Sequence, residues 1–323
     1  MTKPKVGFYW CASCGGCEEA VVDLAEKILD VVEAVDIVFW PCAMDFKKDD
    51  VRAMPDGGID VLFLNGAIRT SEEEEMARLM RQKAQVLVAF GSCSQTGGIP
   101  GLGNLYTRDE ILANSYFDSL TTVNPDRVLP QEHTQVPEGE VELPHFEDEV
   151  RSLDQTVEVD YYLPGCPPPV NLIVNALEAI LKGELPEKGS ILAPNVALCK
   201  ECPRIDSKPE DVSLKEIKRP HEVEIDPETC LLAQGLLCLG PATRSGCEAA
   251  CVQGNMPCTG CLGPVDKVHD YGLSAIKAIA SIIDSEDEGE IGRILDQIPD
   301  PVGSLNRYSL PKTFLHRKVT HQG

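Results

Sequence analysis

The positions of 14 cysteines constrain this chain of 323 residues more than any other feature. Their share of the sequence is far below the roughly 8–10% of small disulfide scaffolds. The N-terminal segment shows no basic region, apolar stretch or cleavage site of a secretory signal, so we expect a cytoplasmic protein with reduced thiols. Clustered cysteines in that compartment are metal ligands or catalytic groups more often than disulfides.

The charge of the chain narrows the choice of partners. It carries 29 lysines and arginines against 52 aspartates and glutamates, a formal net charge of −23. Because nucleic acids are bound by basic surfaces, we expect no nucleic-acid partner. The longest apolar runs are much shorter than the roughly 20 residues needed to cross a bilayer, so we also expect no membrane span.

The first 190 residues alternate between two kinds of segment. Short apolar runs rich in Val, Phe and Tyr predict strands, at residues 5–10, 35–40, 60–66, 85–91 and 157–165. Longer amphipathic runs between them predict helices, at residues 18–35, 71–84 and 169–183. This order predicts βαβ units and a doubly wound parallel sheet with helices on both faces. We assign this α/β domain to residues 1–189.

The alternation decays between residues 102 and 155. The stretch is rich in Pro, Glu, Asp and His, and we interpret it as a surface excursion inserted before the last strand. A partner contact and a mobile acidic loop are both open interpretations.

The character of the sequence changes after residue 189. Residues 190–264 have little periodicity, many prolines and glycines, and eight cysteines. Such a segment cannot bury much apolar surface by itself and needs disulfides or bound metal to stabilise its fold. Two helical stretches, 264–284 and 288–298, and a tail follow. We expect a second, small and irregular domain with few helices at residues 190–323.

Four cysteines of the first domain lie just after the ends of predicted strands. Cys14 and Cys17 follow strand 5–10, Cys93 follows strand 85–91, and Cys166 follows strand 157–165. Ligands of an open α/β sheet bind outside the carboxyl ends of its strands, so these four thiols can converge on one site. The turn between Cys14 and Cys17 also opens a helix, whose N–H groups favour thiolates.

The second domain holds enough cysteines for two sites with four thiolates each. The eight thiols are Cys199, Cys202, Cys230, Cys238, Cys247, Cys251, Cys258 and Cys261. Spacing alone leaves zinc and iron–sulfur clusters open, because four thiolates suit both. Three sets of four exceed what a zinc ribbon needs, and one set lies at a sheet edge where a redox centre is useful. Both observations favour clusters.

Several motifs together resemble one family. They are residues 14–19 (CGGCEE), 91–93 (GSC), 165–168 (GCPP) and 237–247 (LCLGPATRSGC). With them, the chain resembles the small, electron-transferring subunit of nickel–iron hydrogenases along most of its length. The resemblance implies a flavodoxin-like first domain, a second domain of iron–sulfur clusters, and H2 activation on a separate large subunit. No catalytic residue is then expected on this chain.

The resemblance also apportions the cysteines among three 4Fe–4S clusters. It implies a proximal cluster on Cys14, Cys17, Cys93 and Cys166, a distal cluster on Cys199, Cys202, Cys230 and Cys238, and a medial cluster on Cys247, Cys251, Cys258 and Cys261. Cys199 stands where membrane-bound and periplasmic members have a histidine, and Cys251 supplies a thiolate that their medial site often lacks. Cys11 and Cys42 stay unassigned.

In both of these positions the chain resembles the cytosolic, viologen-reducing group of the family. Its members pass electrons to heterodisulfide reductase. The implied partners are therefore a large subunit and a small iron–sulfur acceptor subunit, heterodisulfide reductase, or both. A deazaflavin-reducing small subunit, a sulfhydrogenase-type small subunit and a zinc-stabilised interaction module are the alternatives. Glu19 matches the motif glutamate and could relay a proton, or it could simply stabilise a helix N-terminus.

Overall fold

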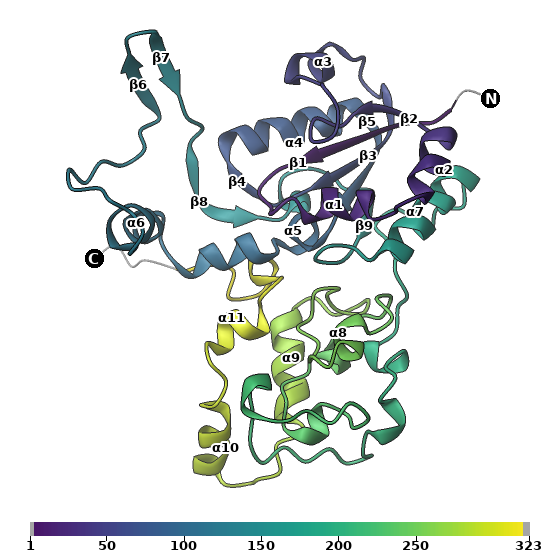
Figure 1. Ribbon diagram of the computed structural model, residues 1–323, viewed down its shortest axis with the longest axis vertical. Helices are drawn as coiled ribbons and strands as arrows, with labels where there is room; N and C mark the ends of the chain where they lie inside the picture. Colours follow the sequence, from purple (N-terminus) through teal and green to yellow (C-terminus); the bar gives the residue numbers. More distant parts are fainter. Residues whose placement is uncertain (1–2, 319–323) are drawn as a thin grey trace.

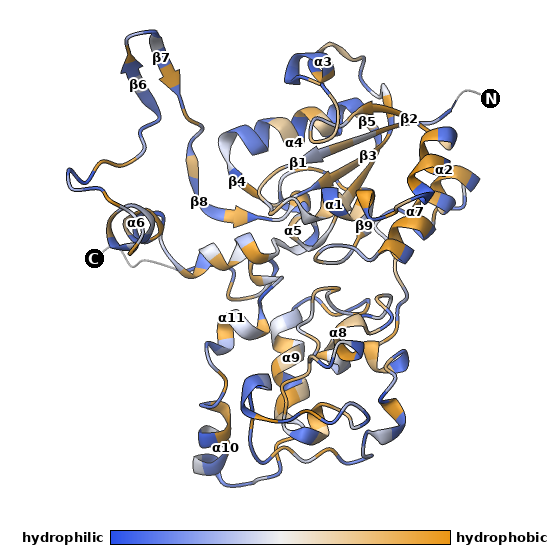
Figure 2. Ribbon diagram, in the orientation of Figure 1, coloured by the Kyte–Doolittle hydropathy of each residue, from blue (hydrophilic) through white to orange (hydrophobic). Residues whose placement is uncertain are grey.

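The computed structural model describes residues 3–318, so the outer ends of both predicted domains, 1–2 and 319–323, lie outside the described residues. Figure 1 shows an α/β unit with an irregular unit below it. Colouring by hydropathy places the most continuous apolar segments on the strands and on the helices against them (Figure 2). No helix within residues 3–318 is long and apolar enough to cross a membrane.

The α/β unit is built on one parallel sheet of five strands in the order β2-β1-β3-β5-β9. Its strands are β1 (Lys5–Trp10), β2 (Asp36–Phe39), β3 (Ile59–Asn65), β5 (Ala84–Phe90) and β9 (Tyr161–Leu163). This order is that of a flavodoxin-like doubly wound sheet, which confirms the predicted fold class. Strand β9 is shorter than predicted because the side chain of Asp160, just before it, accepts the Leu87 N–H in place of a backbone carbonyl.

Helices cover both faces of the sheet, as its strands without polar alternation require. On one face, α1 (Gly16–Val22), α2 (Lys27–Ala34) and α7 (Val170–Lys182) pack over a core that includes Phe8, Phe63 and Phe90. On the other face, α3 (Lys48–Ala53) and α4 (Ser71–Lys83) enclose Leu62, Leu87 and their neighbours. The helices predicted at 71–84 and 169–183 are confirmed with small shifts at their ends.

The single helix predicted at 18–35 is wrong, because the structure divides it between α1 and α2. The break lies at Ala25, whose φ of 51° is left-handed. The break lets Leu24 enter the core beside α7, where only 2% of it is exposed.

The excursion at 102–155 is more ordered than a loop. It contains α6 (Arg108–Ala113), a hairpin of β6 (His133–Val136) and β7 (Gly139–Glu142), and β8 (Phe146–Arg151), which pairs antiparallel with β4 (Ile68–Thr70). Its base is fixed where Asn104 exchanges two hydrogen bonds with the backbone of Val150. Figure 1 shows the hairpin projecting away from both units.

The lower unit consists of turns and four short helices, α8 (Ala250–Gln253), α9 (Tyr271–Ala280), α10 (Glu288–Leu295) and α11 (Pro301–Leu305). The helix predicted at 264–284 begins only at Tyr271, because Asp270 caps it by accepting the Leu273 N–H at 2.8 Å. The buried guanidinium of Arg244 joins this unit to the linker, donating to the carbonyls of Ala193 and Pro194.

Residues 308–316 return to the α/β unit. The Thr96 hydroxyl donates to the Tyr308 carbonyl at 2.6 Å, and the side chains of Gln155 and Asn104 donate to the carbonyls of Pro311 and His316. This segment also contacts the lower unit, where the Phe314 N–H donates to the Asp270 carboxylate at 2.8 Å, so it bridges both units. The boundary between 1–189 and 190–323 stays a prediction.

Candidate metal centres

Four thiols gather at the carboxyl edge of the sheet, and we call them the strand-edge group: Cys14, Cys17, Cys93 and Cys166. Cys17 lies in α1 and Cys93 in α5 (Ser92–Thr96), directly beyond β1 and β5. Burial raises the pKa of Cys17, and the thiols of Cys93, Cys166 and Cys14 raise it further. Burial and the thiols of Cys166 and Cys14 raise the pKa of Cys93 to about 12. The structure thus brings together all four residues that the strand ends predicted.

Two glycines let the backbone approach these thiols closely. Gly91 has a φ of +86°, and a Cβ on it would lie 2.4 Å from Cys17 Sγ and 3.4 Å from the Gly165 carbonyl. Gly98 has a φ of +54°, and a Cβ there would lie 2.5 Å from Cys93 Sγ. Only glycine fits both the left-handed backbone and the contact distance. The loops around the strand-edge group therefore pack their backbone directly against the thiols.

The lower unit contains two further sets, which we call the outer group (Cys199, Cys202, Cys230 and Cys238) and the middle group (Cys247, Cys251, Cys258 and Cys261). In the outer group, burial and the other three thiols raise the pKa of Cys199 to about 11, while Lys208 opposes this shift. In the middle group, burial and the thiols of Cys247 and Cys251 raise the pKa of Cys261 to about 12. The thiol of Cys258 interacts with Cys238 of the outer group as well as with Cys261 of its own group.

The three groups form a continuous row. The backbone of Cys166 lies near the Cys261 thiol and lowers its pKa, which brings the strand-edge group next to the middle group. The Ser92 hydroxyl reinforces this link by donating to the Cys261 carbonyl at 2.6 Å. At the other end, the Cys258 N–H donates to Cys238 Sγ at 3.4 Å, which joins the middle group to the outer group. The middle group therefore touches both of the others.

Each donor set offers four thiolates, which is the ligand set of a 4Fe–4S cluster. Among residues 3–318, no three His, Cys, Asp or Glu side chains lie close enough to hold one metal ion. A tetrahedral zinc site with Zn–S bonds of about 2.3 Å requires closely spaced sulfurs. A four-iron cluster is larger and holds its four thiolates further apart. Its iron would also offset the repulsion that raises the pKa of these thiols.

The two glutamates after Cys17 differ in their surroundings. Glu18 is buried, and its carboxylate accepts hydrogen bonds from Trp40 Nε1 and, at 2.6 Å, from Asn65 Nδ2. Burial raises its pKa against the effect of these two bonds. Glu19, favoured by the motif, is exposed in the first turn of α1. The sequence offered a clue to Glu18, because Trp40 and Asn65 both lie where strands next to β1 end.

The two unassigned cysteines stay outside the three groups. Cys11 is buried in the core on the α4 face of the sheet, and burial raises the pKa of its thiol. Cys42 is exposed on the turn after β2. Neither contributes to the row of thiols.

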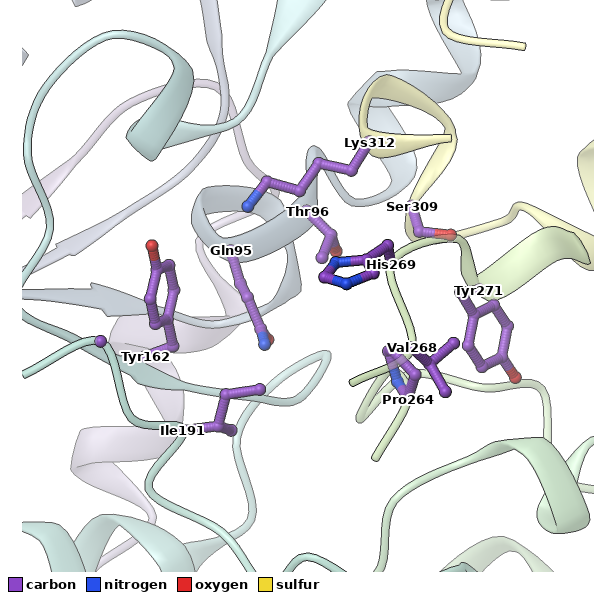
Figure 3. Close-up of a pocket in the computed structure, with 11 residues that line it drawn as sticks. Gln95, Thr96, Tyr162, Ile191, Pro264, Val268, His269, Tyr271, Ser309 and Lys312 are labelled. Atoms are coloured by element: carbon purple, nitrogen blue, oxygen red, sulfur yellow. The ribbon is translucent and has the colours of Figure 1, made fainter. Parts of the chain in front are cut away.

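A cavity of about 340 Å³ lies between the two units, beside α5 (Figure 3). Its walls include Gln95, Tyr162, His269, Ser309 and Lys312, and Lys312 is paired with Asp154. Within residues 3–318, no cysteine lines this cavity. His269 therefore faces a space that no cysteine of the described residues lines.

Comparisons with known proteins agree with this geometry. The protein family described as "NADH ubiquinone oxidoreductase, 20 Kd subunit" matches residues 14–180. The chain is 42% identical to the iron–sulfur subunit of the F420-non-reducing hydrogenase of Archaeoglobus profundus, over 98% of both chains. It is 37% identical to the corresponding subunit of the F420-non-reducing hydrogenase of Methanothermobacter marburgensis, over 99% of both chains.

The fold has relatives among solved structures. A chain of the recombinant NiFeSe hydrogenase from Desulfovibrio vulgaris Hildenborough superimposes with a TM-score of 0.52. The match covers 83% of this chain and 95% of the other, at 19% sequence identity. At that identity the likeness concerns the fold alone.

Proposed function

Because the chain belongs to the small-subunit family of nickel–iron hydrogenases, we propose that it carries electrons between a catalytic large subunit and an acceptor protein. The large subunit performs the catalysis, and this chain is the iron–sulfur part of the oxidoreductase. In the proposal, electrons from H2 oxidation pass through three 4Fe–4S clusters to a cytoplasmic acceptor such as a heterodisulfide reductase complex.

The continuous row of three thiol groups carries this proposal. The strand-edge group is proposed to hold the proximal cluster, the middle group the medial cluster and the outer group the distal cluster. Bound clusters supply one-electron transfer. The chain's own residues bury the thiols and link neighbouring groups through the Ser92 hydroxyl and the Cys258 N–H. A structural zinc module has no need of such an ordered row.

The choice of acceptor rests on the relatives and the ligand set. F420 is a deazaflavin, and the relatives named above are called non-reducing toward it, which speaks against the deazaflavin-reducing alternative. The higher identity to the F420-non-reducing subunits, 42% and 37% against 26% for a sulfhydrogenase 2 subunit delta, favours the heterodisulfide-reductase-linked type over the sulfhydrogenase type. A small iron–sulfur subunit is proposed to stand between the distal cluster and that acceptor.

The large subunit is proposed to bind at the carboxyl edge of the sheet, beside the strand-edge group. Glu19 is exposed there and is the proposed proton relay. The projecting hairpin β6–β7 starts from the same region, because its neighbour β8 pairs with β4, which follows β3 closely. An isolated two-stranded hairpin is marginal in water, so we propose that this one contacts a partner subunit.

Co-purification tests the proposed function. A tagged chain isolated without oxygen from its natural host is expected to bring down a nickel-containing large subunit and an iron–sulfur acceptor. The identities of the acceptor bands separate heterodisulfide reductase from the sulfhydrogenase alternative. A chain that elutes alone with zinc and without a nickel protein contradicts the proposal. The same tag on an unrelated acidic protein controls for capture by charge.

A further inference from the structure

One carboxylate connects two of the thiol groups. Glu201 belongs to the Cys199–Cys202 loop of the outer group, but its side chain reaches the loop that carries Cys247 of the middle group. Its Oε1 accepts the N–H groups of Gly246 at 2.9 Å, Cys247 at 3.2 Å and Ala249 at 3.4 Å. The same oxygen lies 3.9 Å from Cys247 Sγ.

The backbone around Cys247 is shaped to bind an anion. Gly246, Glu248 and Ala249 have φ values of 124°, 54° and 53°. Successive N–H groups converge in such conformations and form a concavity that binds negative charge. Left-handed backbone at two consecutive non-glycine residues is costly and persists only where its surroundings impose it. The Glu201 carboxylate supplies the anion that this segment is built around.

The thiol of Cys247 shares this concavity with the carboxylate. Burial raises the pKa of Cys247, the N–H groups of Ala249 and Ala250 lower it, and Glu201 raises it. N–H bonds to sulfur and nearby positive charge favour the reduced state of an iron–sulfur cluster, and nearby negative charge favours the oxidised state. Glu201 is partly buried, so water screens its charge less than that of a surface glutamate.

We propose that Glu201 is a positioning residue that holds the reduction potential of the middle cluster low and ties the outer loop to the middle loop. The proposal rests on the function proposed above, in which the middle group holds a 4Fe–4S cluster. In this proposal, the charge of Glu201 sets the reduction potential of the cluster that lies between the other two. The carboxylate acts through the Cys247 loop, since Glu201 is not itself proposed as an iron ligand.

The test is a Glu201→Gln substitution in the complex with its large subunit, purified without oxygen. Glutamine keeps the length of the side chain and an acceptor oxygen for the three N–H groups, and it removes the charge. We expect all three clusters to assemble and the midpoint potential of the middle cluster to move in the positive direction. Redox titration followed by electron paramagnetic resonance measures this shift. The middle cluster is the one whose signal changes in a Cys251→Ser variant.

Glu248→Gln is the matched control. Glu248 directly follows Cys247, but its side chain is exposed, so we expect the potential to move much less. Glu201→Ala removes the acceptor as well, and we expect it to lower the occupancy of the middle cluster. A Glu201→Gln potential equal to the wild-type value, or shifted no more than in Glu248→Gln, overturns the inference. Failure of the proposed function would look different, because the wild-type complex would then lack three cluster signals.

Discussion

Replacing Cys166 by serine is expected to remove the proximal cluster and to spare the other two. Cys166 is the thiol that follows β9 in the strand-edge group, and its electrostatic partner there is Cys14. A hydroxyl is a much poorer ligand than a thiolate for iron in a cluster. The chain should therefore lose about four iron atoms, the content of one 4Fe–4S cluster. Hydrogen-dependent dye reduction by the complex should fall to background.

Cys42→Ser is the control for this substitution. Its thiol is exposed and outside the three groups, so the same chemical change should leave the iron content and all cluster signals unchanged. Electron paramagnetic resonance of the reduced complexes provides the comparison. If all three signals survive in the Cys166→Ser variant, the assignment of the strand-edge group is wrong.

Adding one methyl group at Gly91 is expected to have a comparable effect. In Gly91→Ala the new Cβ would lie 2.4 Å from Cys17 Sγ, on a backbone whose φ is +86°. The Cys17 thiol would have to leave its place in the strand-edge group, since the methyl group and the sulfur cannot occupy the same space. The proximal cluster should be absent or greatly reduced, and the middle and outer clusters should remain.

Gly183→Ala separates the contact from the backbone strain. Gly183 also has a positive φ, +68°, but a Cβ there meets nothing within 4 Å. Gly183→Ala carries the left-handed penalty of about 1–2 kcal/mol. Gly91 combines its positive φ with a ψ of 166°, a backbone region that is essentially restricted to glycine, so Gly91→Ala should reduce the thermal stability more. Only Gly91→Ala should lose iron. An equal iron content in the two variants would show that close backbone approach is not needed by the proximal site.

The fold was predictable where local patterns decide it. Each parallel strand is a short apolar run, and the helices between them follow their amphipathic period, so the doubly wound sheet could be inferred. The break at Ala25 could not, because it depends on how Leu24 packs against α7. The contact of Pro311 with the α/β unit could not be predicted either, because its hydrogen bond with Gln155 joins positions that are distant in the chain.

The candidate sites show the same division. Position after a strand predicted that Cys14, Cys17, Cys93 and Cys166 gather, because parallel strands end at one edge. No local pattern indicated that Cys258 approaches Cys238 or that Glu201 reaches Cys247. Those contacts depend on left-handed backbone and on turns without periodicity. Such features come from the packing of the lower unit, and the spacing of the cysteines along the sequence does not predict them.

The iron and acid-labile sulfide content of the complex, purified without oxygen, tests the central claim most directly. After subtraction of the metals of the large subunit, we predict about twelve iron and twelve sulfide per chain, the content of three 4Fe–4S clusters. Bound zinc without sulfide would contradict the account, and so would iron and sulfide for only one cluster.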